Sequence, residues 1–230
     1  MKTTKIAITE DGKVFREQFE SEEITITDAA LEALAEGLPT TIQNAFAVGG
    51  INVSIVKNKQ DIYCTLELSV LPLKAPYAVV GDGILAPSFG ATNQPILDLK
   101  WTPPEGMRIK LLVLVASNGT GALIKEQWLM VFDAERRCYR LPSGNLYDDA
   151  RLCNGAMLRT HPTIQAAVQA ELVQLEKGQW NGDLNTRELQ ASELFRFKPT
   201  NETFEQQPPL KLWADLCDKI NPAIIKHVVL

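Results

Sequence analysis

The sequence predicts an α+β fold in which an antiparallel β-meander is flanked by helices. Two patterns and the composition predict it. Alternating, β-branched segments come in pairs separated by turn residues, and helical segments follow these pairs instead of alternating with single strands. The 230 residues are 45% hydrophobic and 22% charged, close to the average of soluble globular proteins. A chain of this length buries enough apolar surface to fold without disulfides or structural metal ions.

The first part of the chain, residues 1–100, is predicted to be an N-terminal α/β region of strands and one helix. Two short strands and the turn between them are expected at Lys5–Thr9, Asp11-Gly12 and Glu23–Ile26. A helix then follows a cap at Thr27 or Asp28 and ends at Gly37.

A hairpin is predicted after Gly49-Gly50, because Ile51–Val56 and Ile62–Leu71 are alternating runs separated by a polar stretch that includes Lys57-Asn58-Lys59-Gln60. Residues 72–109 carry six prolines: Pro72, Pro76, Pro87, Pro95, Pro103 and Pro104. Proline breaks helices and removes a backbone donor. We therefore expect a loop-rich connector here, with the first domain boundary inside it.

The second domain is expected to span residues 101–190 and to begin with a meander. Its strands are predicted at Lys110–Ala116, Gln127–Asp133 and Arg137–Leu141, with a turn at Ser117-Asn118-Gly119 between the first two. The pattern from Pro142 to Leu158 is irregular.

One long helix is predicted after this irregular stretch. It starts with Pro162 as its first residue, runs to about Lys177 and stops at Gly178. Its apolar stripe consists of Ile164, Val168, Leu172 and Leu175. A helical C-terminal extension, residues 191–230, contains a last helix near Leu210–Ile220.

The net charge, the apolar runs and the cysteines of the chain indicate which classes of partner and which cellular location to expect. The chain has 23 basic and 28 acidic residues, a net charge of −5, which argues against nucleic acid as the main partner. No window reaches the roughly 18 apolar residues of a membrane span, so we expect no membrane partner. The four cysteines form no CxxC pair and no export signal is apparent, which favours a reducing, cytoplasmic location.

Three motifs compete for a functional interpretation. Gly81–Ala86 spells a dinucleotide-binding fingerprint, but Pro87 follows at once and no helix begins there, so it is interpreted as a turn. A zinc site drawn from Cys138, Cys153, His161 and His227 would lack the close ligand pairs of structural zinc sites. A cysteine hydrolase that combines Cys153 with a histidine stays open, because nucleophile and base need to meet only in space.

The segment from Leu141 to Cys153 carries a family resemblance. It reads Leu-Pro-Ser-Gly-Asn-Leu-Tyr-Asp-Asp-Ala-Arg-Leu-Cys, and Asn145 precedes Cys153 by eight residues. This resembles the active-site segment of ubiquitin-conjugating enzymes, in which His-Pro-Asn precedes the catalytic cysteine at that spacing. Ser143-Gly144 replaces His-Pro, and Ala150 stands where the turn glycine is usual.

The loss of the motif histidine, with His161 following the cysteine, resembles the prokaryotic ubiquitin-conjugating-enzyme-like family D. This family includes protein B of the PRTRC (ParB-related, ThiF-related) cassettes. The specific likeness covers residues 141–162, and the order of elements over residues 110–178 agrees with it. The resemblance implies a ubiquitin-conjugating-enzyme-like fold for the second domain.

The resemblance also implies a function. Cys153 would carry a ubiquitin-like modifier as a thioester and transfer it to an amine or thiol acceptor. The implied partners are an activating enzyme of ThiF type, a ubiquitin-like protein and a JAB-type peptidase. No cofactor or metal is implied for this chain. The alternative is a non-catalytic adaptor of a bacterial or phage ubiquitin-like cassette, with Cys153 buried.

Each candidate site residue has a possible catalytic role and a possible structural role. A thiolate accepts and releases acyl groups well, but a cysteine is also a small buried hydrophobe. Asn145 could donate to an oxyanion or only shape a turn. Asp148 and Asp149 could orient an amine or lie on a solvated turn, and His161 could act as a base or only precede the helix.

Overall fold

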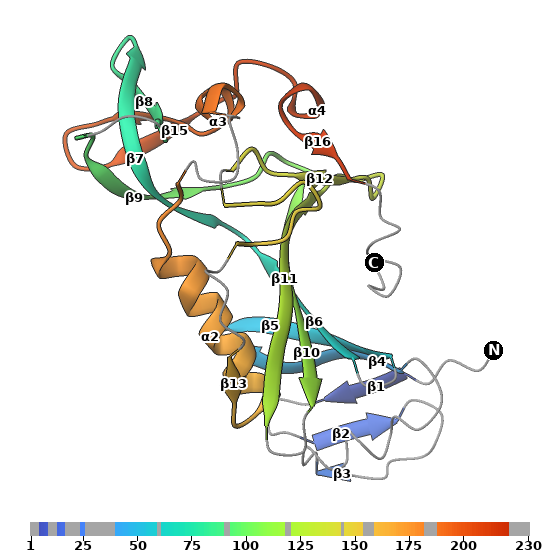
Figure 1. Ribbon diagram of the computed structural model, residues 1–230. Helices are drawn as coiled ribbons and strands as arrows, with labels where there is room; N and C mark the ends of the chain where they lie inside the picture. The colour runs from blue at the N-terminus through green and yellow to red at the C-terminus, as the bar shows by residue number, and fades with distance from the viewer. Residues whose placement is uncertain are drawn as a thin grey trace.

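A computed structural model describes most of the chain. The described residues are 5–8, 13–16, 24–25, 40–58, 61–89, 93–117, 121–143, 145–153, 159–181 and 188–220. They form two mainly antiparallel β-sheets with few helices (Figure 1). The predicted α+β class is confirmed at this level, with strands outweighing helices.

The larger sheet has the strand order β16-β12-β11-β10-β6-β5-β4-β1-β2-β3 within the described residues, and β13 pairs with β11. The bounds of these strands are β1 Lys5–Ile8, β2 Lys13–Arg16, β3 Ile24–Thr25, β4 Thr40–Val48, β5 Ile51–Asn58, β6 Asp61–Leu68, β10 Arg108–Ser117, β11 Ala122–Phe132, β12 Cys138–Arg140, β13 Thr160–His161 and β16 Asp218–Lys219. Neighbouring strands are antiparallel except β1 and β4, which are parallel.

The smaller sheet has the order β15-β14-β8-β7-β9. Its strands are β7 Leu71–Gly81, β8 Ile84–Pro87, β9 Ile96–Trp101, β14 Arg196–Pro199 and β15 Phe204–Gln207. The described helices are α2 Ile164–Lys177, α3 Glu188–Leu194 and α4 Trp213–Leu216. In Figure 1, α2 lies beside the larger sheet, and the long β7 leads from that sheet to the smaller one.

Both predicted hairpins of the larger sheet are confirmed. β5 and β6 pair through Asn58 and Asp61, and alternate residues of β6 are buried, as the alternating pattern requires. β10 and β11 pair along their length and are followed by β12. Strand β11 begins five residues before the predicted strand.

The N-terminal expectations are met in part. The two predicted strands are confirmed as β1 and β3, but they do not pair with each other, because the unpredicted β2 pairs with both. The long strand β4 was missed. The predicted turn at Asp11-Gly12, most of the turn at residues 117–119 and the helix over residues 27–37 lie outside the described residues.

The loop-rich connector is wrong, because residues 71–101 supply three strands of the smaller sheet. The Lys74 carbonyl accepts a hydrogen bond from the Trp180 amide, at 2.7 Å, on the side of β7 away from β9. Backbone groups of alternate residues point to the same side of a strand. Pro72 and Pro76 thus lack their N–H on the side that β9 does not use, and β8 pairs on that side only from Tyr77 onward.

Helix α2 matches its prediction except at its first residues. It begins at Ile164, because the Thr163 side chain caps it by accepting a hydrogen bond from the Ala166 amide at 3.0 Å. Pro162 therefore lies just outside the helix. The predicted apolar stripe is buried, and Gly178 ends the helix as expected.

The C-terminal prediction is largely wrong. The helix expected near residues 210–220 is only the short α4, followed by β16. Strand β16 forms because Lys219 pairs with Tyr139 and the Ile220 amide donates to the Cys138 carbonyl at 2.9 Å. The α3 helix and the β14–β15 hairpin were also missed.

Two clusters of buried side chains lie on opposite faces of the β10–β11 pair. The larger contains residues from Ile42 to Cys217 and includes the apolar side of α2. The smaller includes Trp128, Met130 and Phe132. The division at residues 100 and 190 stays a prediction. Among the described helices, none has both the length and the apolar character needed to cross a bilayer.

Candidate active site

The predicted active-site segment folds into a small hairpin laid against β11. Leu146 bridges to Leu152, and the Tyr147 amide donates to the Arg151 carbonyl at 2.9 Å. At the open end, the Cys153 amide donates to the Asn145 carbonyl at 2.8 Å. The eight-residue spacing therefore places Asn145 and Cys153 opposite each other.

Strand β11 holds this hairpin in place. The Leu152 amide donates to the Gln127 carbonyl at 2.9 Å, and the Leu129 amide donates to the Ala150 carbonyl at 3.1 Å. Ala150 has a φ of +64° and is fully buried. An alanine in this left-handed conformation costs roughly 1–2 kcal/mol. The position is one where glycine is favoured, the residue that the resemblance leads us to expect there.

Cys153 is the least buried of the four cysteines. Its side chain is half-buried, whereas Cys64, Cys138 and Cys217 are buried. Burial raises the pKa of Cys64 and of Cys138 to about 12, which keeps those thiols protonated and unreactive at neutral pH. Among the cysteines, Cys153 is thus the candidate nucleophile.

Cys153 faces a cavity of about 220 Å³ between the hairpin and the C-terminal end of α2. The lining residues are Gln127, Asn145, Leu152, Cys153, Gln174, Leu175, Gly178, Gln179 and Trp180. The structure therefore brings two of the predicted site residues, Asn145 and Cys153, to one cavity.

Tyr147 is a neighbour of the thiol that was missed from the sequence. Its hydroxyl donates a hydrogen bond to the Cys153 Sγ at 3.6 Å. This hydrogen bond is the main cause of a raised pKa of Tyr147. The Arg151 guanidinium lies 5.3 Å from the centre of the same ring, a cation–π distance.

The Asn145 side chain joins the hairpin to the segment after α2. Its Nδ2 donates to the Gln179 carbonyl at 3.1 Å, and its Oδ1 accepts from the Asn181 amide at 2.6 Å. A carboxamide nitrogen carries two N–H groups, so one remains beside the cavity. The residue is half-buried, which makes it more than an exposed turn residue.

Asp148 and Asp149 lie at the turn of the hairpin and each binds an arginine. Neither aspartate lines the Cys153 cavity. Asp148 is exposed and lies 2.7 Å from Arg140, a buried guanidinium. Asp149 accepts from the Arg151 Nε at 2.7 Å, and Arg151 also reaches Glu126 at 3.2 Å. Arg151 is thus paired with carboxylates next to Cys153.

His161 does not reach Cys153 through the sheet. It lies opposite Ala122 in the β13–β11 pairing, whereas Leu152 bonds to Gln127. Five strand residues separate these points on β11, which corresponds to about 17 Å at 3.4 Å per residue. Within the described structure, the hydrolase alternative therefore finds no base in His161. The second histidine, His227, lies outside the described residues.

A buried polar pair supports the cavity wall and was also missed. Gln127 and Glu171 are both buried, and the Gln127 Nε2 donates to the Glu171 carboxylate. Burial raises the pKa of Glu171. The available signal was the position of Glu171, which follows Ile164 by seven residues and therefore shares the apolar side of α2.

Comparisons of this chain with family models, curated proteins and solved structures find no match. Within the described residues, no group of three His, Cys, Asp or Glu side chains is arranged to hold a metal ion.

The contacts around the cavity define the candidate site as Cys153, Asn145 and Tyr147, supported by Gln127 and Glu171.

Proposed function

We propose that this chain is a ubiquitin-conjugating-like protein that carries a ubiquitin-like modifier as a thioester on Cys153. It transfers the modifier to an amine or thiol acceptor. The observation that carries the proposal is the hairpin that places Asn145 opposite Cys153 and opens both onto one cavity. The resemblance of residues 141–162 to the prokaryotic family D supports the same assignment.

The order of elements also supports it. A meander of β10, β11 and β12 leads into an irregular hairpin that ends at the cysteine, and α2 follows. This is the order that the resemblance implies for a ubiquitin-conjugating-enzyme-like fold. Strands β7 to β9 stand between β6 and β10, as an insertion into the meander.

The chemistry needs two exchanges at one carbonyl carbon. The Cys153 thiolate attacks the thioester that joins the modifier to its activating enzyme of ThiF type. A new C–S bond forms, the old one breaks, and the departing thiolate takes a proton from solvent. An acceptor amine or thiol then attacks the same carbon, Cys153 leaves as a thiolate, and the acceptor releases its proton to solvent. The activating enzyme consumes the ATP.

Two neighbours have roles in these exchanges. The Tyr147 hydroxyl donates to the Cys153 sulfur and stabilises the thiolate both as it forms and as it leaves. The second N–H of the Asn145 amide donates to the oxyanion of the tetrahedral intermediate, an effect worth about 3–4 kcal/mol in other enzymes. His161 and the acidic pair take no part in this mechanism, because His161 pairs with a distant part of β11 and the two aspartates do not line the cavity.

The direct test is thioester formation. The purified chain is incubated with ATP, an activating enzyme of ThiF type and a ubiquitin-like protein, and the products are separated with and without reducing agent. We expect an adduct that thiols dissolve, a more stable oxyester for Cys153→Ser and no adduct for Cys153→Ala. Cys138→Ala is the matched control and should load normally. A thiol-sensitive adduct on Cys153→Ala would overturn the proposal.

One observation favours the adaptor alternative. Both ends of the Asn145 amide bond to backbone groups, and Asp148 and Asp149 bind arginines, as in a site built for structure alone. Native alkylation with iodoacetamide, followed by peptide mass spectrometry, separates the two functions. Fast labelling of Cys153, with the other cysteines protected, favours the carrier. Labelling only after denaturation favours the adaptor.

A further inference from the structure

A second cavity lies on the other face of the larger sheet. It measures about 400 Å³ and is lined by Gly106, Arg108, Lys110, Phe132, Asp133, Ala134 and Arg136. Lys110 lies opposite Met130, and Met130 and Phe132 belong to the smaller core cluster. The α2 side chains pack in the larger cluster. The β10–β11 pair therefore separates this cavity from the one at Cys153.

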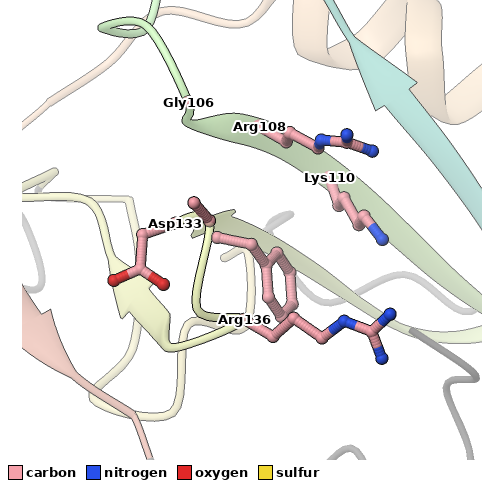
Figure 2. Close-up of a pocket in the computed structure, with 7 residues that line it drawn as sticks. Gly106, Arg108, Lys110, Asp133 and Arg136 are labelled. Carbon is pink, nitrogen blue, oxygen red and sulfur yellow. The ribbon is translucent and has the colours of Figure 1, made fainter.

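Three cations line this cavity. Figure 2 shows Arg108 and Lys110 extending side by side from β10, with Arg136 reaching toward the same side from the β11–β12 turn. Neither Lys110 nor Arg136 forms an ion pair with a residue that the structure describes. Arg108 lies 3.6 Å from Glu67, but both side chains are more than half exposed, and such a pair is weak.

The carboxylate in the lining does not neutralise these charges. Asp133 points away from the three cations in Figure 2. It accepts hydrogen bonds from the Arg137 Nε at 2.5 Å, from the Arg137 amide at 2.8 Å and from the Tyr139 hydroxyl at 3.1 Å. The hydrogen bonds of Asp133 thus go to Arg137 and Tyr139, which do not line the cavity.

Lys110 is the most constrained of the three cations. Its Nζ lies 5.2 Å from the centre of the Phe132 ring, and the side chain is half-buried. Burial is the main cause of a lowered pKa of Lys110. Glu67, which lies opposite Lys110 on β6, raises this pKa, and the nearby Arg108 and Arg136 lower it. A bound anion would offset both the lost hydration and the repulsion among the cations.

We propose that this cavity binds a phosphate-bearing small molecule through Arg108, Lys110 and Arg136. Guanidinium groups bind phosphate oxygens in a bidentate geometry, and an ammonium adds a point charge. Three cations match a polyanionic phosphate better than a single carboxylate. The volume lies within the range of small-molecule sites, about 300–1,000 Å³. This site is independent of the function proposed for Cys153.

Calorimetric titration of the full chain with inorganic pyrophosphate tests the site. Lys110→Met removes the charge and keeps an apolar stem over Phe132. Arg136 has a φ of +62° in an exposed turn, a conformation that glycine adopts more easily, so Arg136→Gly should keep or raise the melting temperature. Lys198→Met is the matched control, because Lys198 is an exposed lysine of the smaller sheet.

We expect saturable binding of one pyrophosphate per chain. Lys110→Met and Arg136→Gly should each weaken it by about tenfold or more, with Lys198→Met unchanged. Absent binding, or an equal loss in the control, would overturn the proposal. Equally tight binding of citrate would contradict the preference for phosphate, and tighter Lys110-dependent binding of a thymidine 20-mer would assign the surface to nucleic acid instead.

Discussion

At the scale of single residues, the site is defined by what each side chain already binds. Asn145 contributes one N–H to the Gln179 carbonyl and its oxygen to the Asn181 amide. Tyr147 contributes its hydroxyl to the Cys153 sulfur. A substitution at either position therefore changes structure and chemistry together, and a useful experiment needs variants that separate the two.

For Asn145, two substitutions separate these roles. Asn145→Ala loses both hydrogen bonds and should lower the free energy of unfolding by about 1–3 kcal/mol. Asn145→Asp keeps an acceptor for the Asn181 amide but has no N–H to donate. We expect its thioester discharge to slow about 10²-fold or more, with loading less affected. Discharge at the wild-type rate in Asn145→Asp would make this residue purely structural.

For Tyr147, the expected effect is on the reactivity of the thiol. Tyr147→Phe removes the hydroxyl that donates to Cys153 and retains the ring under Arg151. Iodoacetamide labelling of Cys153 near pH 7 should slow by about two- to tenfold, because the lost hydrogen bond is worth about 0.5–1.5 kcal/mol. Circular dichroism serves as the control for folding. Unchanged labelling would show that the hydroxyl does not act on the thiolate.

At the scale of elements, α2 and β11 meet at a buried polar contact. Glu171 of α2 accepts from Gln127 of β11, and the Gln127 carbonyl anchors the hairpin through the Leu152 amide. Burial raises the pKa of Glu171 above its ordinary value of 4.5. The folded chain therefore holds this proton more tightly than the unfolded chain does.

The raised pKa of Glu171 sets the direction in which the stability of the folded chain changes with pH. The stability that Glu171 contributes is fully present below pH 4.5 and is lost as the pH rises through the raised pKa of the folded state. Glu171→Gln removes this loss, so the melting temperature of the variant relative to wild type should increase as the pH rises from 4 to 8.

Glu176→Gln, which removes an exposed carboxylate from the same helix, is the matched control. Melting curves measured at several pH values check both variants. A constant difference for Glu171→Gln would mean that this carboxyl titrates alike in the folded and unfolded chain.

At the scale of the whole molecule, an aromatic cluster connects the two sheets. Trp101 of β9 stacks on Trp213 of α4 with ring centres 5.5 Å apart, and meets Phe195 edge-on at 5.2 Å. Trp213 in turn meets Tyr139 of β12, in the larger sheet, at 6.4 Å. The larger core cluster is continuous through these residues.

A continuous core predicts one cooperative unfolding transition. Trp101→Ala should lower the free energy of unfolding by about 3–5 kcal/mol, and tertiary and secondary structure should be lost together. Denaturant unfolding followed by fluorescence and by circular dichroism checks this. Two separated transitions, only one of them shifted by the substitution, would instead support independent domains divided near residues 100 and 190.

Strands and helices were predictable from the sequence where a clear hydrophobic periodicity marks their buried side. Alternation over Asp61–Leu68 and the apolar stripe of α2 report burial directly, because side chains repeat every two residues in a strand and about every 3.6 in a helix. Strand β7 was not predicted because it contains prolines. The sequence does not show on which side of a strand the backbone N–H groups are needed for pairing. Strand β16 exists only through its pairing with β12.

Some features of the candidate site were likewise predictable from the sequence, and others were not. The spacing of eight residues between Asn145 and Cys153 can be read from the sequence, and the hairpin hydrogen bonds explain why that spacing brings them opposite each other. The contact of Tyr147 with the thiol, the buried pair of Gln127 and Glu171, and the pairing of His161 with a distant part of β11 are visible only in the folded chain. The physical reason is that these contacts depend on strand register and helix docking, which join residues far apart in the chain.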